Sequence, residues 1–244
     1  MELPTQNFQK TGVRVIPGMF AKLAPQLKRW ATEIAAMPAT SVWHYFEQTP
    51  GGAGKMLSRT EKFIGFHAGI SGLIESSEFV AALHEAFGEP AVLFKDKLNY
   101  KLRGNIGFEA HQDIQAGWQQ YTEEFVSVGI AIDDQLASGG CLEFVKDNFG
   151  RRLIGELWKP LHEQLFDFSR FEAIPMKSGD VAFFDGWVPH RSWPNRDADS
   201  QRIFYLTFNK KSAGDFRERY YADKFKSFPP DFYRNADKAY AYKV

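Results

Sequence analysis

The 244-residue sequence contains a single cysteine, Cys141, and no excess of charge of either sign. One cysteine cannot form an internal disulfide, so the composition favours a reducing compartment. Lysine plus arginine and aspartate plus glutamate number 30 each, and the sequence pI is about 7.0. This balance gives the chain no general electrostatic attraction to nucleic acid or to an anionic membrane surface, and we expect neither as a partner.

Long apolar runs are also missing. No stretch approaches the ~18 consecutive apolar residues that a membrane-spanning helix needs. The first residues, Met1 to Pro4, do not combine a basic region with a following apolar segment. We therefore expect a cytoplasmic protein. Internal repeats and low-complexity segments are absent as well, so we interpret residues 1–244 as one domain.

Apolar and aromatic residues are abundant, with 44% of residues hydrophobic and 23 phenylalanines. This is enough for one sizeable core, in a single β-rich domain or in two small ones. In the N-terminal part, up to about residue 90, helical spacing predicts an amphipathic helix that begins near Ala24 and a second helix between Ser76 and Gly88. The ring-rich segment 40–60 between them is predicted to be a loop, either a lid or a packed aromatic cluster.

From residue 91 to about 210 the pattern becomes that of β-strands. Alternation in residues 93–102 predicts a strand with one polar face, made of Lys95, Lys97, Asn99 and Lys101. Two interpretations are open: an edge strand with a solvated basic face, or a strand whose polar face lies inside a barrel and suits an anionic ligand. Further strands are predicted at 125–134, 141–145, 181–184 and 202–209, the first two as a hairpin. The charged, aromatic segment 211–244 is expected to be a helix or to wrap around the core.

A His-x-Asp motif, His111-Gln112-Asp113, is the strongest candidate for chemistry. On an extended strand the first and third side chains point to the same side, so an imidazole and a carboxylate can reach one metal ion. A third ligand is expected from His190, just after a predicted strand and turn. Two histidines and one carboxylate leave open coordination positions, as in non-haem Fe(II) oxygenases. The competing interpretation is that these are structural histidines with a turn-stabilising acid.

Such a reaction needs a cosubstrate that supplies two electrons, and 2-oxoglutarate does so while its far carboxylate is held by a fixed cation. Arginine is the residue best suited to that task because its planar fork binds a carboxylate through two hydrogen bonds. Arg202 begins the predicted strand that follows His190, and we expect it to face the same cavity. The Ser192 hydroxyl is expected to assist, with Asn99 and Lys97 as further candidates from the polar strand face.

In combination these motifs resemble the phytanoyl-CoA dioxygenase family of Fe(II)/2-oxoglutarate oxygenases. The resemblance covers roughly residues 90–210 and rests on 97–100, 111–113, 131–134, 140–143, 179–181, 189–192 and Arg202. It implies a mainly β fold with flanking helices and a double-stranded β-helix (jelly-roll, cupin-like) core, spanning about 91–210. It also implies iron bound by His111, Asp113 and His190, and 2-oxoglutarate bound by Arg202. Ser192 and Asn99 match positions that assist the cosubstrate in ectoine hydroxylases.

The resemblance also bears on the reaction and its substrate. Related halogenases replace the carboxylate ligand with a small residue, so Asp113 favours hydroxylation with O2 and release of succinate and CO2. The motifs after the ligands, including residues 115–118, and those at 220–224 are most similar to bacterial aminoethylphosphonate-type dioxygenases. This predicts a small polar substrate such as an aminophosphonate, amino acid or betaine. Trp118 is a candidate pocket wall, able to face an ammonium group or simply part of the core; Arg59 and Trp187 are further candidates.

Three other functions remain open from the sequence. The first is a catalytically silent jelly-roll that binds a small ligand or a partner protein. The second is a zinc hydrolase that uses the same three ligands and needs no 2-oxoglutarate. The third is an acyl-CoA hydroxylase, which is disfavoured because no additional basic patch for CoA phosphates is evident.

Overall fold

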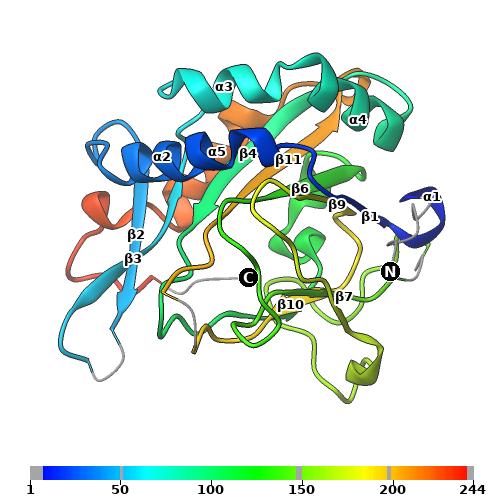
Figure 1. Cartoon of the computed structure of the whole chain (residues 1–244). Helices are drawn as coiled ribbons and strands as arrows, with labels where there is room; N and C mark the ends of the chain where they lie inside the picture. Colours follow the sequence, from blue (N-terminus) through cyan, green and yellow to red (C-terminus); the bar gives the residue numbers. More distant parts are fainter. Residues whose placement is uncertain (1–7, 50–51, 147–149, 197–198, 241–244) are drawn as a thin grey trace.

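A computed structural model describes residues 8–49, 52–146, 150–196 and 199–240 of the chain. Two antiparallel sheets form its framework (Figure 1). The larger sheet has the strand order β1 (Val13–Ile16), β9 (Val181–Asp185), β6 (Phe125–Ala131), β11 (Ile203–Lys210), β4 (Ala91–Asn99), β3 (Lys55–Glu61) and β2 (Trp43–Gln48). The smaller has the order β5 (Phe108–His111), β10 (His190–Ser192), β7 (Leu142–Phe144) and β8 (Glu172–Ala173). This two-sheet arrangement is the expected jelly-roll.

Helices cover one face of the larger sheet (Figure 1). They are α2 (Ala24–Ala35), α3 (Ala68–Ile74) and α4 (Ser77–Phe87), with the single-turn α1 (Phe8–Thr11) near β1. The helix α5 (Arg217–Ser227) instead packs through Tyr220 and Tyr221 in a separate aromatic cluster that includes Trp118. Short 3-10 turns lie at Ala21–Leu23, Asp113–Ala116, Trp118–Gln120, Phe168–Arg170, Lys211–Ala213 and Asp231–Tyr233. Both helices predicted in the N-terminal part are confirmed: α2 begins at Ala24, and α4 runs from a Ser76 cap to a left-handed Gly88. None of the described helices has the length and apolarity to cross a membrane.

The alternation of side chains along the central strands separates the main core from the functional side. Val126, Val128, Phe204 and Leu206 pack with the helices in one apolar cluster. The intervening residues of the same strands point to the opposite face, toward the smaller sheet. Among them are Ser127, Tyr205 and Thr207, which line a cavity there.

Strand β4 belongs to the interior of the larger sheet, because β11 pairs with one of its edges and β3 with the other. The interpretation of residues 93–102 as an edge strand with a solvated face is therefore wrong. Lys95, Lys97 and Asn99 line the cavity between the sheets instead. A polar face in this position suits a polar ligand.

Two sequence predictions about connections are corrected. The segment 40–60 is not a loop: β2 and β3 form a hairpin that extends the larger sheet beside β4, and aromatic residues at 43–46 are good strand formers. Residues 50 and 51 lie outside the described residues. The predicted hairpin of 125–134 with 141–145 is also wrong, because β6 lies in the larger sheet and β7 pairs with β8 and β10 in the smaller one.

Candidate metal centre

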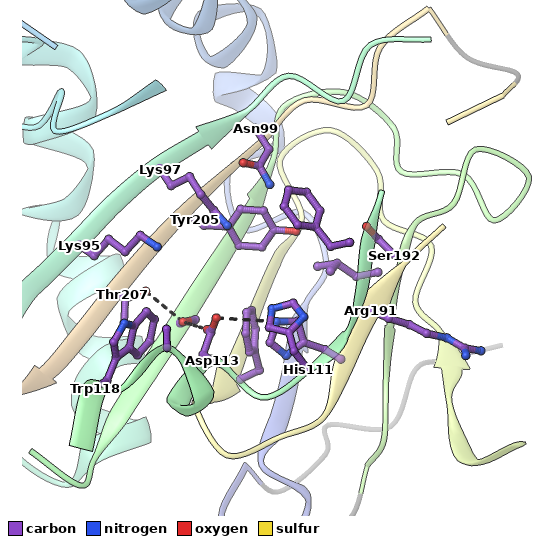
Figure 2. A pocket seen from close by; sticks show the side chains of 16 residues that line it. Lys95, Lys97, Asn99, His111, Asp113, Trp118, Arg191, Ser192, Tyr205 and Thr207 are labelled. Atoms are coloured by element: carbon purple, nitrogen blue, oxygen red, sulfur yellow. Dashed lines mark hydrogen bonds and ion pairs between the residues drawn. The ribbon is translucent and has the colours of Figure 1, made fainter. Parts of the chain in front are cut away.

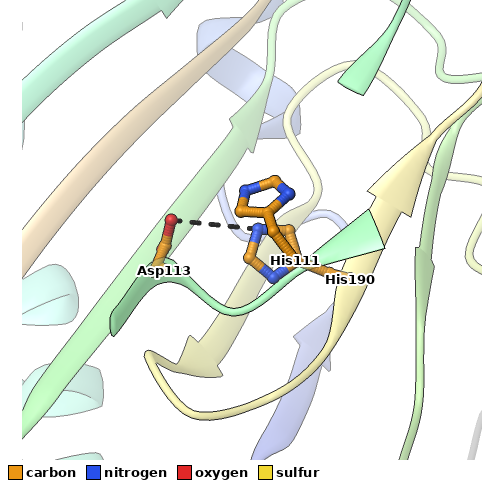
Figure 3. Close-up of side chains that lie close together, drawn as sticks. All are labelled: His111, Asp113 and His190. Carbon is orange, nitrogen blue, oxygen red and sulfur yellow. Dashed lines mark ion pairs between the residues drawn. The ribbon is translucent and has the colours of Figure 1, made fainter. Parts of the chain in front are cut away.

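Three predicted ligands meet at the edge of the smaller sheet (Figure 3). His111 ends β5 and His190 begins β10, and the two are directly paired across the antiparallel strands with their ring centroids 4.3 Å apart. Asp113 opens a 3-10 turn just after β5, with Oδ1 3.9 Å from His190 Nε2. One ligand atom from each residue lies within 4.8 Å of the others. Residues far apart in the chain are therefore close enough to bind one metal ion.

Backbone carbonyls orient both imidazoles. His111 Nδ1 lies 2.7 Å from the carbonyl oxygen of Glu109, and His190 Nδ1 lies 3.0 Å from that of Val188. Because a carbonyl oxygen only accepts, each Nδ1 carries the proton and each Nε2 keeps a free lone pair for a metal. The tautomer of each histidine is thus set by the backbone carbonyl two residues before it.

Protonation also favours metal binding. Burial lowers the pKa of His111 to about 3, and the proximity of His190 acts in the same direction. Burial likewise lowers the pKa of His190. Burial alone would raise the pKa of Asp113, but His190, His111 and a hydrogen bond from Ser127 bring it below its ordinary value. Two neutral imidazoles and a carboxylate are the forms that bind metal.

Gln112 and Gln115 hold the connecting turn in place from within the core. The Gln112 side-chain amide donates to the carbonyl of Trp187, and its oxygen accepts from the backbone of Ile154. The Gln115 oxygen accepts from the Gln112 backbone, and its amide donates to the carbonyls of Glu156 and Lys159. Both glutamines are completely buried. The middle residue of the His-x-Asp motif is therefore a structural anchor for its two neighbours.

A cavity between the sheets contains the three residues and encloses about 640 Å³, including its open mouth (Figure 2). Its lining residues are Lys95, Lys97, Asn99, Phe108, His111, Asp113, Ala116, Trp118, Ser127, Leu142, Phe184, His190, Arg191, Ser192, Tyr205 and Thr207. A second hollow adjoins it and shares Phe108 and His111.

Lys97 and Asn99 place polar groups in the cavity wall that have no hydrogen-bond partner among the described residues. Lys97 Nζ makes no hydrogen bond or ion pair with any described residue and instead lies 4.7 Å from the ring centre of Tyr205 and 5.2 Å from that of Phe108. Burial lowers the pKa of Lys97 to about 7. The side-chain oxygen of Asn99 is buried without a hydrogen bond among the described residues. Unpartnered buried groups of this kind are costly and suit a ligand that pairs with them.

Arg202 does not join this cavity. Its guanidinium donates to both carboxylate oxygens of Asp133, over 2.8 and 2.9 Å, and its backbone N–H donates to the same carboxylate. Arg202 lies just before β11, whose residues Tyr205 and Thr207 face the cavity while the even-numbered ones pack in the helix-side core. Arg202 is therefore not among the described residues that line the cavity, whereas Lys97 is, and the assignment of Arg202 to the cosubstrate stays a prediction.

The remaining candidates are divided between the cavity and its surroundings. Ser192 and Trp118 line the cavity, and the indole N–H of Trp118 is buried without a hydrogen-bond partner in the described part of the chain. Arg59 lines the adjoining hollow, where it lies 3.1 Å from Glu61 and over the ring of Tyr45. Trp187 is buried outside the metal cavity and donates its indole N–H to the carbonyl of Glu123.

Sequence reasoning missed several residues that line the cavity, among them Lys95, Ser127, Tyr205 and Thr207. Lys95 was visible on the polar face of residues 93–102 without being assigned to the site. The period of two that predicted the strand 202–209 also places Tyr205 and Thr207 together on one face, opposite the face of Arg202. Ser127 was hidden because it interrupts a nearly continuous apolar strand. A polar residue in such a strand is the signal that identifies it.

Comparisons with known proteins agree with this geometry. The family model described as "Phytanoyl-CoA dioxygenase (PhyH)" matches residues 8–203. The chain is 38% identical to a methylphosphonate hydroxylase from Gimesia maris over 91% of this chain and 85% of the relative. It is 32% identical to a 2-aminoethylphosphonate dioxygenase from an uncultured bacterium, over 90% and 85%.

Solved structures support the same fold. The crystal structure of EctD from S. alaskensis with 2-oxoglutarate and 5-hydroxyectoine superposes with a TM-score of 0.71 at 18% identity, covering 85% of this chain and 75% of that one. The protein is accordingly an Fe(II)/2-oxoglutarate-dependent dioxygenase with a double-stranded β-helix core that hydroxylates a small substrate. The chain belongs to the phytanoyl-CoA dioxygenase family.

Proposed function

We propose that the enzyme hydroxylates a small alkylphosphonate, with iron bound by His111, Asp113 and His190. The observation that carries the proposal is the charge of the cavity wall. Two lysines, Lys95 and Lys97, line it without an ion pair to any described residue, while Asp113 is the one acidic side chain among the described lining residues. Since Asp113 is needed by the metal, the two cations are available for two anionic ligands.

The residues present fit the metal and the cosubstrate. Two imidazoles in the correct tautomer and one ionised carboxylate form the ligand set of a non-haem iron site with open positions. Iron, 2-oxoglutarate and O2 together supply the oxidising power for C–H hydroxylation, with release of succinate and CO2. The protein's part is to hold the ligands, aim the substrate and limit the access of water.

Lys97 is the residue we assign to the far carboxylate of 2-oxoglutarate. Its unpaired ammonium is buried beside Asn99, whose side chain also lacks a full set of partners. Ser192 and Tyr205 line the same part of the cavity and bring hydroxyl groups (Figure 2). A dianion bound here restores the positive charge that burial disfavours on the free lysine. This assignment replaces Arg202 by Lys97 and retains Asn99 and Ser192.

Lys95 and Trp118 are the groups we assign to the substrate anion. In Figure 2 both lie on the side of Asp113 away from Ser192. Lys95 Nζ lies 5.5 Å from the Trp118 ring centre, and the Trp118 indole N–H has no partner in the described part of the chain. Two donors at one end of the cavity suit phosphonate oxygens. The relatives named for methylphosphonate and 2-aminoethylphosphonate support the same substrate class.

The charge of the wall also separates the candidate substrates. A betaine or an ammonium group needs a carboxylate or a free aromatic face, but the face of Trp118 is already approached by Lys95. A phosphonate without an amino group therefore fits the metal cavity better than the aminophosphonate or betaine considered from the sequence. A longer aminophosphonate is the second candidate, because Glu47 and Glu109 line the adjoining hollow and can attract an amine.

Substrate-dependent succinate release tests the proposal. With Fe(II), 2-oxoglutarate and O2, we expect methylphosphonate or ethylphosphonate to give the highest turnover, 2-aminoethylphosphonate less, and glycine betaine none. His111→Ala and Asp113→Ala should abolish turnover, and His84→Ala, which removes an exposed histidine on α4, should not. Full turnover in either ligand variant would exclude this site, and a preference for betaine would exclude the proposed substrate class.

A further inference from the structure

Two buried hydroxyl groups lie on neighbouring strands behind the metal cavity. Ser127 lies in the middle of β6, every residue of which is buried, and Thr207 lies in β11. The two are direct partners in the β6–β11 register, and they are only 1% and 3% exposed. A buried hydroxyl is costly unless it is hydrogen-bonded, so the bonds that these residues make indicate what they do.

The hydrogen bonds form a chain that ends on Asp113 (Figure 2). Ser127 Oγ donates to Asp113 Oδ2 over 2.6 Å, and the hydroxyls of Ser127 and Thr207 are 3.0 Å apart. A serine hydroxyl has one hydrogen, and here it is directed at Asp113 Oδ2. Thr207 must therefore be the donor to Ser127. The direction of the chain is Thr207 to Ser127 to Asp113.

This chain distinguishes the two oxygens of the carboxylate. Oδ2 is engaged by Ser127, whereas Oδ1 lies 3.9 Å from His190 Nε2, on the side of the histidines. We propose that Ser127, aligned by Thr207, is a positioning residue that restricts Asp113 to one metal-binding oxygen and so reserves a coordination position for 2-oxoglutarate. The inference rests on the proposed function, because it assumes that the triad binds the metal.

The count of coordination positions explains why one oxygen matters. An octahedral ion has six positions, of which two histidines and one carboxylate oxygen occupy three. A 2-oxoglutarate chelate would need two more, which would leave one position open. If both oxygens of Asp113 bound the metal, the cosubstrate and oxygen would compete for the positions that remain. A short charge-assisted hydrogen bond on Oδ2 opposes that second contact.

The test separates binding of the metal from binding of the cosubstrate. Co(II) is titrated calorimetrically into metal-free protein, and 2-oxoglutarate is then titrated into the Co(II) protein. In Ser127→Ala we expect the Co(II) dissociation constant to change less than about threefold and that of 2-oxoglutarate to rise about tenfold. Thr207→Val should also lower the affinity for 2-oxoglutarate without lowering that for Co(II), but by a smaller factor. Thr207→Ser keeps the hydroxyl and should bind 2-oxoglutarate as tightly as the unmodified protein.

A matched control loses a buried hydroxyl elsewhere. Thr60, completely buried on β3, bonds to Tyr100 and His44, so Thr60→Val carries a similar cost in folding without touching Asp113. Its Co(II) and 2-oxoglutarate affinities should match the unmodified protein. The visible d–d spectrum of the Co(II) protein gives a second readout, since its intensity follows the coordination number, and Ser127→Ala should change it before 2-oxoglutarate is added.

Each result decides the question. Unchanged 2-oxoglutarate affinity in Ser127→Ala would overturn the inference, as would a parallel loss of Co(II) and 2-oxoglutarate affinity, which would indicate a general disturbance of the site. Failure of the unmodified protein to bind Co(II) at all would overturn the proposed metal site as well, and this outcome is distinguishable because it precedes any comparison of variants.

Discussion

Arg202 binds both carboxylate oxygens of Asp133, through hydrogen bonds of 2.8 and 2.9 Å, while Lys97 on β4 faces the metal cavity without an ion pair to any described residue. Tyr205 of β11 is paired with Lys97 of β4 in the sheet register, so both side chains emerge on the cavity side. The two basic residues therefore have different tasks. One ties the end of a strand to a loop, and the other is available to a ligand.

Replacing Arg202 should affect stability rather than cosubstrate binding. Arg202→Ala removes two charge-assisted bonds from a mostly buried carboxylate, and we expect a loss of about 1–3 kcal/mol in the free energy of unfolding by urea. The 2-oxoglutarate dissociation constant should change less than about twofold. Lys177→Ala, which breaks the exposed pair with Asp134, is the control and should have little effect on either quantity. A strong rise in the 2-oxoglutarate dissociation constant at unchanged stability would contradict this prediction and indicate that Arg202 binds 2-oxoglutarate.

Removing the charge at Lys97 should weaken 2-oxoglutarate binding and leave folding intact. In Lys97→Met we expect the 2-oxoglutarate dissociation constant of the Co(II) protein to rise about 100-fold, or about 2.7 kcal/mol, because a buried cation no longer meets the carboxylate. Folding should be retained, since methionine fills a similar volume and needs no charge. Lys97→Arg keeps the charge, so its 2-oxoglutarate dissociation constant should rise less than that of Lys97→Met. Calorimetry checks all three proteins, and equal affinities would remove Lys97 from its assigned role.

The lowered pKa of Lys97 also predicts how stability depends on pH in the ligand-free protein. The pKa is about 7 in the folded state against an ordinary value of 10.5, so between these values the unfolded chain binds more protons. Stability contributed by this group therefore rises as pH increases from about 7 to 10.5, by at most about 1.4 kcal/mol per pH unit. Urea unfolding of the unmodified protein and of Lys97→Met measures the difference, which should shrink steadily over this range. A constant difference would contradict the prediction.

Metal binding should be nearly independent of pH around neutrality. Burial holds the pKa of His111 at about 3 and lowers that of His190, so neither imidazole has a proton to lose when the metal binds. We expect the Co(II) dissociation constant at pH 6.0 to lie within about twofold of its value at pH 7.5, whereas two histidines of ordinary pKa would weaken binding about tenfold. Calorimetry in buffers of different ionisation enthalpy also measures the proton release directly. Release of a full proton per metal ion would show that the histidines are protonated in the free protein.

Lys95 should act on the substrate alone. In Lys95→Met we expect the KM for methylphosphonate to rise about tenfold or more, since a cation facing the phosphonate is lost, while the KM for 2-oxoglutarate stays within about twofold. Lys62→Met, on the loop after β3 and outside the cavity lining among the described residues, is the control. Steady-state succinate release at varied concentrations of each substrate separates the two effects. Equal changes in both KM values would show that Lys95 does not discriminate between the ligands.

Much of the metal site followed from local sequence. The His-x-Asp motif works because Gln112 has extended backbone angles, so the side chains two positions apart share a side even though Asp113 has already left the strand. The helix start at Ala24 and the strand period of residues 93–102 are also local properties. The period of apolar residues depends on the local backbone geometry of a helix or strand, so it can be identified without knowing which other elements pack against it.

The sequence alone determined which residue types are available to bind a metal and an anion, and on which strands they lie. Only the tertiary structure decided that Lys97 rather than Arg202 faces the histidines, that β4 is an internal strand, and that Ser127 and Thr207 meet behind Asp113. The reason is that alternation divides a strand into two faces without saying which face meets the other sheet. That choice depends on pairing between strands far apart in the chain.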